Sequence, residues 1–338
     1  MGSSGKTPEQ KKQQEELTSH YKYDPISFFT KCLDVNPEHV WGKMVEIAES
    51  VRDHQFTAIK AGNSLSKSYT AARVAMWFLY THYPATVVTT APSHTQVEEI
   101  LWREIGAAHS NARMPLGGSP TKTALDLQTW ARKSNLKNVE KWYALGFATK
   151  PDTVDSHATR FQGFHNQNVL LIFDEAAGID EKIWEAADKL LTTQSQKLMV
   201  IGNPTMSKGR FVECFKDKRY NKITVSVLDS PNYIAGEEVI PGLSGKEFVE
   251  FVIDKYGKDS NYYKAMVTGE IPSEDIDSLI PITWIEKAEG REVDHHFRFI
   301  KKFLVWDVAD GGDDLHVIKC WENTTEIDSV EIRGKKIE

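Results

Sequence analysis

Four short apolar segments constrain the fold more than any other feature of the sequence. They are FTAIKA (56–61), TVVTTAP (86–92), NVLLIFDEA (168–176) and KLMVIGNPT (197–205). These segments lack the apolar–polar alternation of a half-exposed strand, so each predicts a strand that is covered on both faces. Helical segments separate them. Strands that alternate with helices predict an α/β fold whose sheet is mostly parallel, with helices on both faces.

Composition excludes several classes of protein. The chain has 338 residues and a net charge of −7, which gives no global attraction to nucleic acid but leaves room for a local basic track. Cys32, Cys214 and Cys320 are far apart, so they predict neither a metal-ligand cluster nor a disulfide framework, and an intracellular setting is expected. The most apolar run, VAMWFLY (74–80), is too short to span a membrane and predicts a buried helix.

The segment AGNSLSKSYT (61–70) has the features of a phosphate-binding loop. It lies between a predicted strand and a predicted helix from Lys67 to Thr81, which is the context that this motif requires. The lysine is expected to contact the outer phosphates of ATP, and the hydroxyl of Ser68 to ligate Mg²⁺. Ser66 replaces the usual glycine, and its β-carbon is tolerated cheaply only where the backbone is helical. The residues assigned to the nucleotide are Ala61, Gly62, Asn63, Ser64, Leu65, Ser66, Lys67, Ser68 and Tyr69.

Two further strands are expected to bring polar residues to the same edge of the sheet. LLIFDEA ends in Asp174 and Glu175, and the carboxyl edge of a parallel sheet is where ligands bind. Asp174 would hold Mg²⁺, and Glu175 would orient or deprotonate the attacking water. Asn203, in IGNPT, could sense the γ-phosphate. The alternatives are a solvated Asp-Glu pair and an ordinary turn, since Gly-Asn-Pro is strong turn chemistry.

The order of these motifs resembles the large subunit of tailed-phage terminases. The resemblance rests on AGNSLSKS, VLLIFDEAAGI and VIGNPT, followed by KYGKDSNYYKAMVTGEIPSEDIDSLIP and FLVWDVADGGDD. It implies a P-loop NTPase domain of the ASCE type, a small linking subdomain and an RNase H-like nuclease. It also implies an ATP-driven motor that moves double-stranded DNA into a procapsid in the host cytoplasm and is not expected in the mature virion. The partners that it implies are the portal protein, the small terminase subunit and other copies of the chain in a ring, usually a pentamer.

On this resemblance the sequence divides into four predicted segments. Residues 1–22 form a flexible leader and residues 23–229 an ATPase domain. Residues 230–295 form a linker or lid subdomain. Residues 296–338 form an incomplete N-terminal part of the nuclease domain.

The resemblance also assigns residues that the motifs alone do not. The family uses an arginine finger, often from a neighbouring subunit, and Arg160 is the first candidate and Arg113 the second. Family members often contact adenine through a Trp-Gln pair, whereas this chain has Trp41-Gly42, so Tyr23, Phe28 and Trp41 are the candidates for stacking on the base.

A nuclease metal site is predicted to be incomplete. Asp307, at the end of FLVWD, matches the first metal acid of the family nuclease, and Asp313 and Asp314 follow it. A two-metal nuclease needs several converging carboxylates. The family draws the others from later strands, so no nuclease activity is expected from these 338 residues.

Two basic runs are candidates for contact with DNA phosphates. RKSNLKNVEKWY carries Arg132, Lys133, Lys137 and Lys141, and KDKRYNK spans residues 216–222. Such side chains would give salt-dependent binding that is independent of sequence. The alternative is a solvated helix face or hairpin.

Two other functions remain open at this point. A helicase-like ATPase would share the first motifs, although the sequence shows neither a convincing downstream arginine-rich helicase motif nor a second complete α/β domain. An assembly module that binds nucleotide without efficient turnover would fit the serine at position 66.

Overall fold

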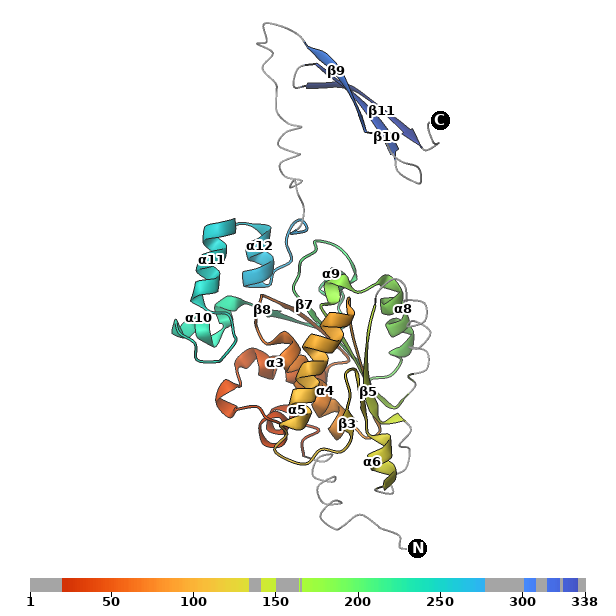
Figure 1. Ribbon diagram of the computed structural model, residues 1–338, viewed down its shortest axis with the longest axis vertical. Helices are drawn as coiled ribbons and strands as arrows, with labels where there is room; N and C mark the ends of the chain where they lie inside the picture. Colours follow the sequence, from red (N-terminus) through yellow and green to blue (C-terminus); the bar gives the residue numbers. More distant parts are fainter. Residues whose placement is uncertain are drawn as a thin grey trace. The chain divides into compact units, whose positions relative to one another are not determined.

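The protein consists of two compact units, residues 1–277 and 278–338. The computed structural model describes residues 20–133, 141–149, 164, 166–276, 301–307, 315–322 and 325–333. Most of the predicted leader therefore lies outside the described residues. The first unit contains an eight-stranded sheet, and the second contains a three-stranded sheet (Figure 1).

The large sheet confirms the predicted α/β fold. Its strand order is β3-β4-β5-β2-β6-β7-β1-β8. Six strands run parallel: β1 (Phe56–Ala61), β2 (Ala85–Ala91), β5 (Tyr143–Ala148), β6 (Asn168–Asp174), β7 (Gln196–Gly202) and β8 (Tyr220–Val225). Strand β7 lies between β1 and β6, the arrangement of an ASCE-type P-loop fold. Every residue of β2, β6 and β7 is buried, which explains why these strands do not alternate.

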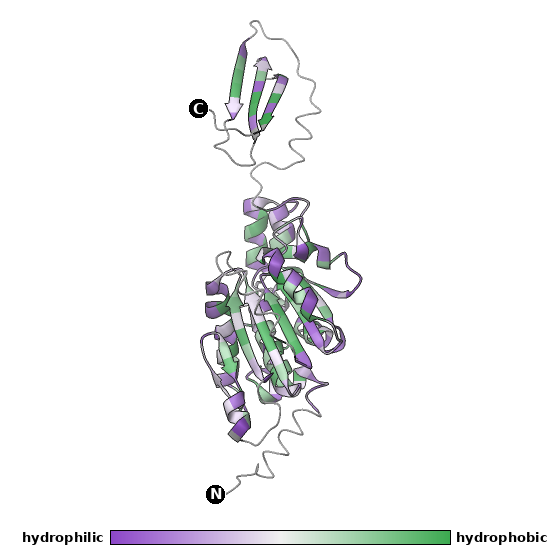
Figure 2. Ribbon diagram, turned by 90° about the vertical axis from the view of Figure 1, so that its right-hand side faces the viewer, coloured by the Kyte–Doolittle hydropathy of each residue, from purple (hydrophilic) through white to green (hydrophobic). Residues whose placement is uncertain are grey.

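Helices cover both faces of this sheet (Figure 1). One face carries α3 (Gly42–Asp53), α4 (Lys67–Thr81) and α5 (Arg103–Ser110), and the other carries α8 (Glu181–Leu190) and α9 (Arg210–Cys214). Each face has its own cluster of buried apolar side chains, and Figure 2 shows the apolar strands running between the helices. Shorter elements are α2 (Pro25–Ser27), η1 (Phe28–Cys32), η2 (Pro37–His39), η3 (Gln96–Trp102), α6 (Gln128–Lys133) and η6 (Ala176–Gly178).

Two stretches form strands that the sequence analysis did not predict. The stretch that contains Gly117, Gly118 and Pro120 forms β3 (Ser119–Pro120), which pairs antiparallel with β4 (Ala124–Asp126) at the sheet edge. The basic run 216–222 leads into β8, a strand that the sequence analysis did not predict. The burial of β8 does not alternate, and Lys222 is exposed between the half-buried Asn221 and the buried Ile223, so the sequence lacks the usual strand pattern.

A small group of helices, called the lid subdomain below, lies within the first unit and includes the described part of the predicted lid segment, residues 230–276. It contains η7 (Val227–Asp229), α10 (Pro231–Ala235), α11 (Lys246–Tyr256), α12 (Asn261–Tyr263) and η8 (Lys264–Thr268). Its helices follow β8 directly, and η8 contacts β1. The strand that leads into the phosphate loop is therefore in contact with this subdomain.

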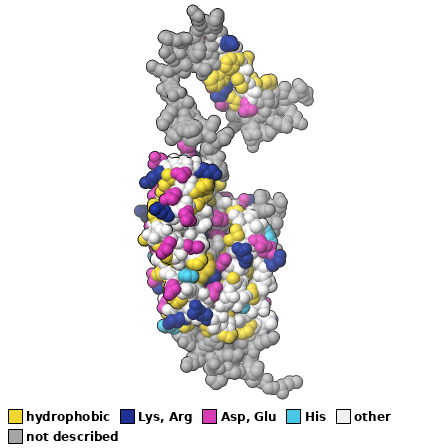
Figure 3. Space-filling view, turned by 60° about the vertical axis from the view of Figure 1, so that its left-hand side comes forward, with side chains coloured by type: hydrophobic (Ala, Val, Ile, Leu, Met, Phe, Trp, Pro, Cys, Tyr) yellow, Lys and Arg dark blue, Asp and Glu magenta, His cyan; other side chains and the backbone are white. Residues whose placement is uncertain are grey.

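The second unit is a small antiparallel sheet. Its order is β11-β10-β9, formed by β9 (Lys302–Asp307), β10 (Leu315–Glu322) and β11 (Thr325–Arg333). Large apolar side chains such as Leu304 and Trp306 are exposed on it, and Figure 3 shows hydrophobic side chains gathered on this unit.

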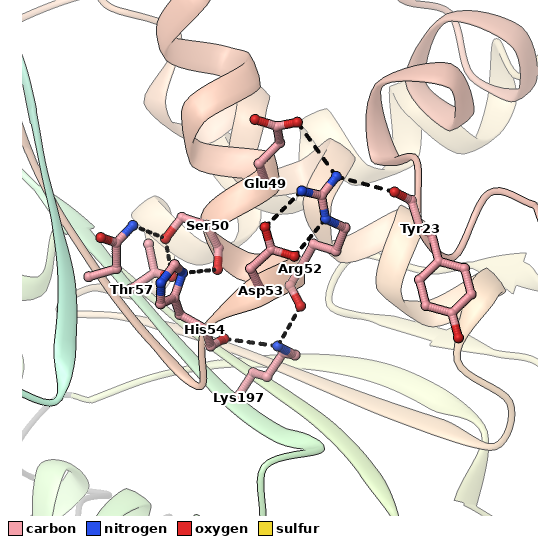
Figure 4. A network of polar contacts seen from close by, with 9 residues as sticks. Tyr23, Glu49, Ser50, Arg52, Asp53, His54, Thr57 and Lys197 are labelled. Atoms are coloured by element: carbon pink, nitrogen blue, oxygen red, sulfur yellow. Dashed lines mark hydrogen bonds and ion pairs between the residues drawn. The ribbon is translucent and has the colours of Figure 1, made fainter.

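A polar network fastens α3 to the amino-terminal end of β7 (Figure 4). The Nζ of Lys197 donates hydrogen bonds to the carbonyls of Arg52 (3.0 Å) and His54 (2.9 Å). Burial lowers the pKa of Lys197 to about 8, and the charge of Asp53 opposes this shift.

We expect the Lys197→Met variant to differ from the wild type in its pH dependence. The folded-state pKa of Lys197 lies below that of the unfolded chain, so the unfolded chain holds more protons between pH 8 and pH 10. Over this range the wild type should gain about 1 kcal/mol of unfolding free energy relative to the variant, after allowance for solvent screening. Urea unfolding at each pH measures the difference. Lys189→Met, which removes an exposed lysine of α8, is the control, and a parallel pH trend for the Lys197 and Lys189 variants would contradict the expectation.

Candidate active site

The loop from Gly62 to Ser66 connects β1 to α4 with two residues in the left-handed region. Ser64 has φ 48°, and Ser66 has φ 52° and ψ 33°. The backbone at Ser66 is thus left-handed, the conformation that the missing glycine would favour. A non-glycine residue there costs on the order of 1 kcal/mol. The loop therefore has the shape of a phosphate loop despite its sequence, and it carries strain.

Gly62 is required by close packing. A β-carbon at Gly62 would lie 2.8 Å from the carbonyl oxygen of Met266 and 2.9 Å from that of Val267. The amide of Gly62 donates to the carbonyl of Val225, and the amide of Asn63 donates to the carbonyl of Met266. The beginning of the loop is therefore held against β8 and η8.

The first residues of α4 meet the acidic end of β6. Ser68 Oγ donates a hydrogen bond to Asp174 Oδ2 at 2.9 Å, which joins two residues 106 positions apart. Lys67 Nζ donates to the carbonyl of Gly62 at 3.2 Å. Burial lowers the pKa of Lys67, while the nearby charges of Glu175 and Asp174 act in the opposite direction. The structure thus brings together the lysine, the hydroxyl and the carboxylates that the sequence predicted.

Asp174 is a buried carboxyl whose surroundings shift its pKa in opposite directions. Burial and the charge of Glu175 raise its pKa to about 6, while the hydrogen bonds from Ser68 and from the Glu175 amide, with the charge of Lys67, oppose the shift. Oxygen donors from Ser68 and Asp174 are the kind that Mg²⁺ prefers, so this pair fits that ion.

Glu175 follows in a left-handed conformation, with φ 48° and ψ 47°. The chain turns at this residue into η6, and the amide of Gly178 donates to the carbonyl of Glu175. Gly202, at the end of β7, lies behind this turn, because a β-carbon there would lie 3.0 Å from the amide nitrogen of Ala176. Glu175 follows Asp174 in the chain, so its half-buried side chain lies at the same edge of the sheet as the Ser68–Asp174 pair.

Asn203 connects the next strand to the phosphate loop. Its side-chain amide donates to the carbonyl of Ala61 at 2.7 Å, and its side chain is buried. Ala61 is the last residue of β1. The residue predicted to sense the γ-phosphate is thus hydrogen bonded to the start of the loop that would hold it.

Tyr69 and Leu65 complete the assigned stretch. The guanidinium carbon of the buried Arg73 lies 3.4 Å from the centroid of the Tyr69 ring, and Arg73 also binds Asp34 and Glu104. Leu65 is buried in the core. One face of the Tyr69 ring is therefore covered by Arg73.

Arg113 is the candidate finger arginine that the structure describes. Arg113 donates to the carbonyl of Val35 at 3.4 Å, and its amide donates to the carbonyl of Cys32, so it is tied to the N-terminal segment. Arg160 lies outside the described residues, and its role stays a prediction. Trp41 and Phe28 are buried in the core, whereas Tyr23 is 68% exposed.

The predicted DNA-binding and nuclease residues are only partly described. Arg219 of the second basic run binds Asp217 and lies over the Phe56 ring. Lys137, Asp313 and Asp314 lie outside the described residues, as does the side chain of Lys133. Asp307 ends β9 opposite Val317, and within the described ranges no group of three His, Cys, Asp or Glu side chains could hold a metal ion.

Sequence reasoning missed Ser244. It precedes α11, where a helix-capping serine is expected, but the N-cap is Gly245 and no side chain caps the helix. The Oγ of Ser244 instead donates to the carbonyl of Asn63 at 2.9 Å, and its amide donates to the carbonyl of Ser64. A contact across 181 positions leaves no local signal in the sequence.

Comparisons with known proteins give a distant relative. No protein-family model matches the chain. It is 24% identical over 318 residues to the probable terminase large subunit of Enterobacteria phage P7. The chain is thus similar in sequence to a probable terminase large subunit. The match covers 90% of this chain and 59% of the relative's length.

Solved terminase structures are also similar to the chain. The large terminase ATPase domain of Thermus phage P74-26 matches at 16% identity with a TM-score of 0.45, covering 69% of this chain and 94% of that one. The large terminase of another thermophilic bacteriophage, in complex with ATP-γ-S, matches at 12% identity with a TM-score of 0.42, covering 94% and 68%. None of the helices in the described part of this chain has the length and hydrophobicity needed to cross a bilayer.

Replacing Ser66 with glycine should stabilise the protein. Glycine adopts the left-handed conformation of this residue without the steric penalty, so the free energy of unfolding should rise by about 1 kcal/mol. Ser66→Ala is the matched control, because the Ser66 side chain makes no capping hydrogen bond and alanine keeps the penalty. Denaturant unfolding measures both. An equal gain in the alanine variant, or a loss in the glycine variant, would contradict the strained loop.

Proposed function

We propose that this chain is an ATP-hydrolysing motor subunit that moves double-stranded DNA into a viral procapsid. The observation that carries the ATPase part is the 2.9 Å hydrogen bond from Ser68 to Asp174, next to Lys67, at the carboxyl edge of a parallel sheet. A phosphate-loop hydroxyl bonded to a strand-end carboxylate is the arrangement that a magnesium–nucleotide site requires. A solvated Asp-Glu pair does not account for the burial of Asp174.

Each residue then has a role in hydrolysis. The amides of residues 64–68 and the Nζ of Lys67 bind the β- and γ-phosphates. Ser68 and Asp174 would hold Mg²⁺, which would neutralise charge on the transferred phosphoryl group. Glu175 orients or deprotonates the attacking water. Asn203, through its bond to Ala61, links the γ-phosphate side of the site to the start of the phosphate loop.

The motor part of the proposal rests on homology. The relative is a probable terminase large subunit, and this chain spans 59% of its length. We infer that other copies of the chain form a ring at the portal protein, with the small terminase subunit and double-stranded DNA as further partners. Arg160 from a neighbouring copy would complete the site by stabilising charge on the phosphoryl group, with Arg113 as the second candidate.

Two substitutions test the ATPase assignment. Lys67→Ala should lose both ATP affinity and turnover, because it removes the half-buried cation of the loop. Glu175→Gln should keep ATP affinity and lower kcat by about 100-fold or more, because an amide cannot accept a proton. Phosphate release and calorimetry measure turnover and binding. Glu185→Gln, an exposed acid of α8, is the control. Wild-type turnover in either variant rejects the assignment, and nucleotide binding without turnover in the wild type favours an assembly module.

Mixing variants tests the shared site. If Arg160 acts across subunits, the rate per chain should rise with protein concentration, and Arg160→Ala should abolish most of the turnover. Mixing Arg160→Ala with Glu175→Gln should restore part of the activity, because each variant supplies what the other lacks. Phosphate release in the mixture is the measurement, and Arg113→Ala serves as the parallel variant. Full activity of Arg160→Ala, or a rate independent of concentration, contradicts the role in trans.

A further inference from the structure

The phosphate loop has two left-handed serines and no glycine at either position. Ser64 and Ser66 have φ 48° and 52°. Such residues persist only where their surroundings determine the backbone. The bonds of Gly62 and Asn63 to Val225 and Met266 hold the beginning of the loop, but they end before the first left-handed residue.

We propose that Ser244 of the lid subdomain is the positioning residue that holds the phosphate loop in its nucleotide-binding shape. This inference deepens the proposed function and rests on it. Ser244 makes two hydrogen bonds to the loop: Oγ donates to the carbonyl of Asn63 and the amide donates to the carbonyl of Ser64, both at 2.9 Å. Ser244 is 8% exposed, so water competes little for these bonds.

The geometry of the peptide bond turns these contacts into control of the loop amides. In a planar trans peptide the carbonyl and the following N–H point in opposite directions. Because the carbonyls of Asn63 and Ser64 face Ser244, the N–H groups of Ser64 and Leu65 face away from it. Amide groups that point to one side of a loop form the concave site that binds a phosphate.

The segment that carries Ser244 is itself fastened. The buried side chain of Asn232 in α10 donates to the carbonyls of Ile240 (2.8 Å) and Leu243 (2.9 Å). Its Oδ1 accepts hydrogen bonds from the amides of Val239 and Ile240. Asn232 donates two of these hydrogen bonds and accepts two. Together they fix residues 239–243, so the backbone that precedes Ser244 is held in place.

The arrangement gives the lid subdomain a direct influence on nucleotide affinity. A shift of residues 239–245 relative to β1 would release both carbonyls and free the strained serines to relax. Phosphate binding and lid position are then coupled through Ser244.

Calorimetry with ATP-γ-S and Mg²⁺, together with steady-state kinetics, tests the proposal. Ser244→Ala should raise the Kd and the KM about 3- to 10-fold, the effect of one hydrogen bond, with kcat nearly unchanged. Ser244→Thr, which keeps the hydroxyl, should restore most of the affinity. Adding Ser66→Gly to Ser244→Ala should also recover affinity, because glycine adopts the left-handed conformation without the steric penalty of a β-carbon.

A matched control separates positioning from general loss of stability. Ser260 caps α12 in the same subdomain: its Oγ accepts a hydrogen bond from the amide of Tyr263 at 3.1 Å and donates to the carbonyl of Gly257 rather than to the phosphate loop. Ser260→Ala should lower thermal stability and leave the Kd unchanged. Wild-type affinity in Ser244→Ala, or an equal loss in Ser260→Ala, overturns the proposal.

If the proposed ATPase function is wrong, the experiments give a different result from the one expected if Ser244 does not position the loop. If the wild type binds ATP-γ-S without hydrolysing it, the ATPase assignment fails and the affinity comparison still tests Ser244. If the wild type binds no nucleotide, hydrogen exchange of the amides of Asn63 and residue 244, which donate to the carbonyls of Met266 and Ser64, tests Ser244 alone in the free protein. Faster exchange in Ser244→Ala than in Ser260→Ala supports positioning, and equal exchange overturns it.

Discussion

The hydrogen bond between Ser68 and Asp174 is the interaction on which the candidate site depends. It joins the start of α4 to the end of β6, so it fixes the distance between the phosphate loop and the acidic strand. The parallel sheet makes this contact possible, because β1, β7 and β6 lie side by side and end at one edge. Glu175 and Asn203 directly follow β6 and β7, so they lie at the same edge. A chain with these motifs in another strand order would not bring the groups together.

The loop above this bond is strained and externally supported. Phosphate loops commonly use glycine where the backbone becomes left-handed, whereas this chain places Ser64 and Ser66 there. The compensation comes from residues 225–267, which bind the carbonyls and amides of residues 62–64. Support from outside the loop makes its shape dependent on the lid subdomain. In the motor that we propose, nucleotide binding and lid movement would share this one set of hydrogen bonds.

The sequence predicts the centre of the fold well and its periphery poorly. Strand β1 and helix α4 have the predicted bounds, because buried strands and the helix after a phosphate loop leave strong local patterns. Strand β8 was missed because its burial does not alternate and it carries the exposed Lys222, and β3 and β4 were missed because they are only two and three residues long. Ser244 could not be found from sequence, since its partners lie about 180 positions away. Contacts of that kind depend on tertiary packing.

The most direct test of the magnesium–nucleotide site is a crystal structure of the protein with Mg²⁺ and a non-hydrolysable ATP analogue. We predict that the amides of residues 64–68 surround the phosphates and that the metal lies between Ser68 and Asp174, in place of their 2.9 Å hydrogen bond. An analogue bound elsewhere, or a Ser68–Asp174 hydrogen bond that stays intact beside the bound phosphates, would contradict the account.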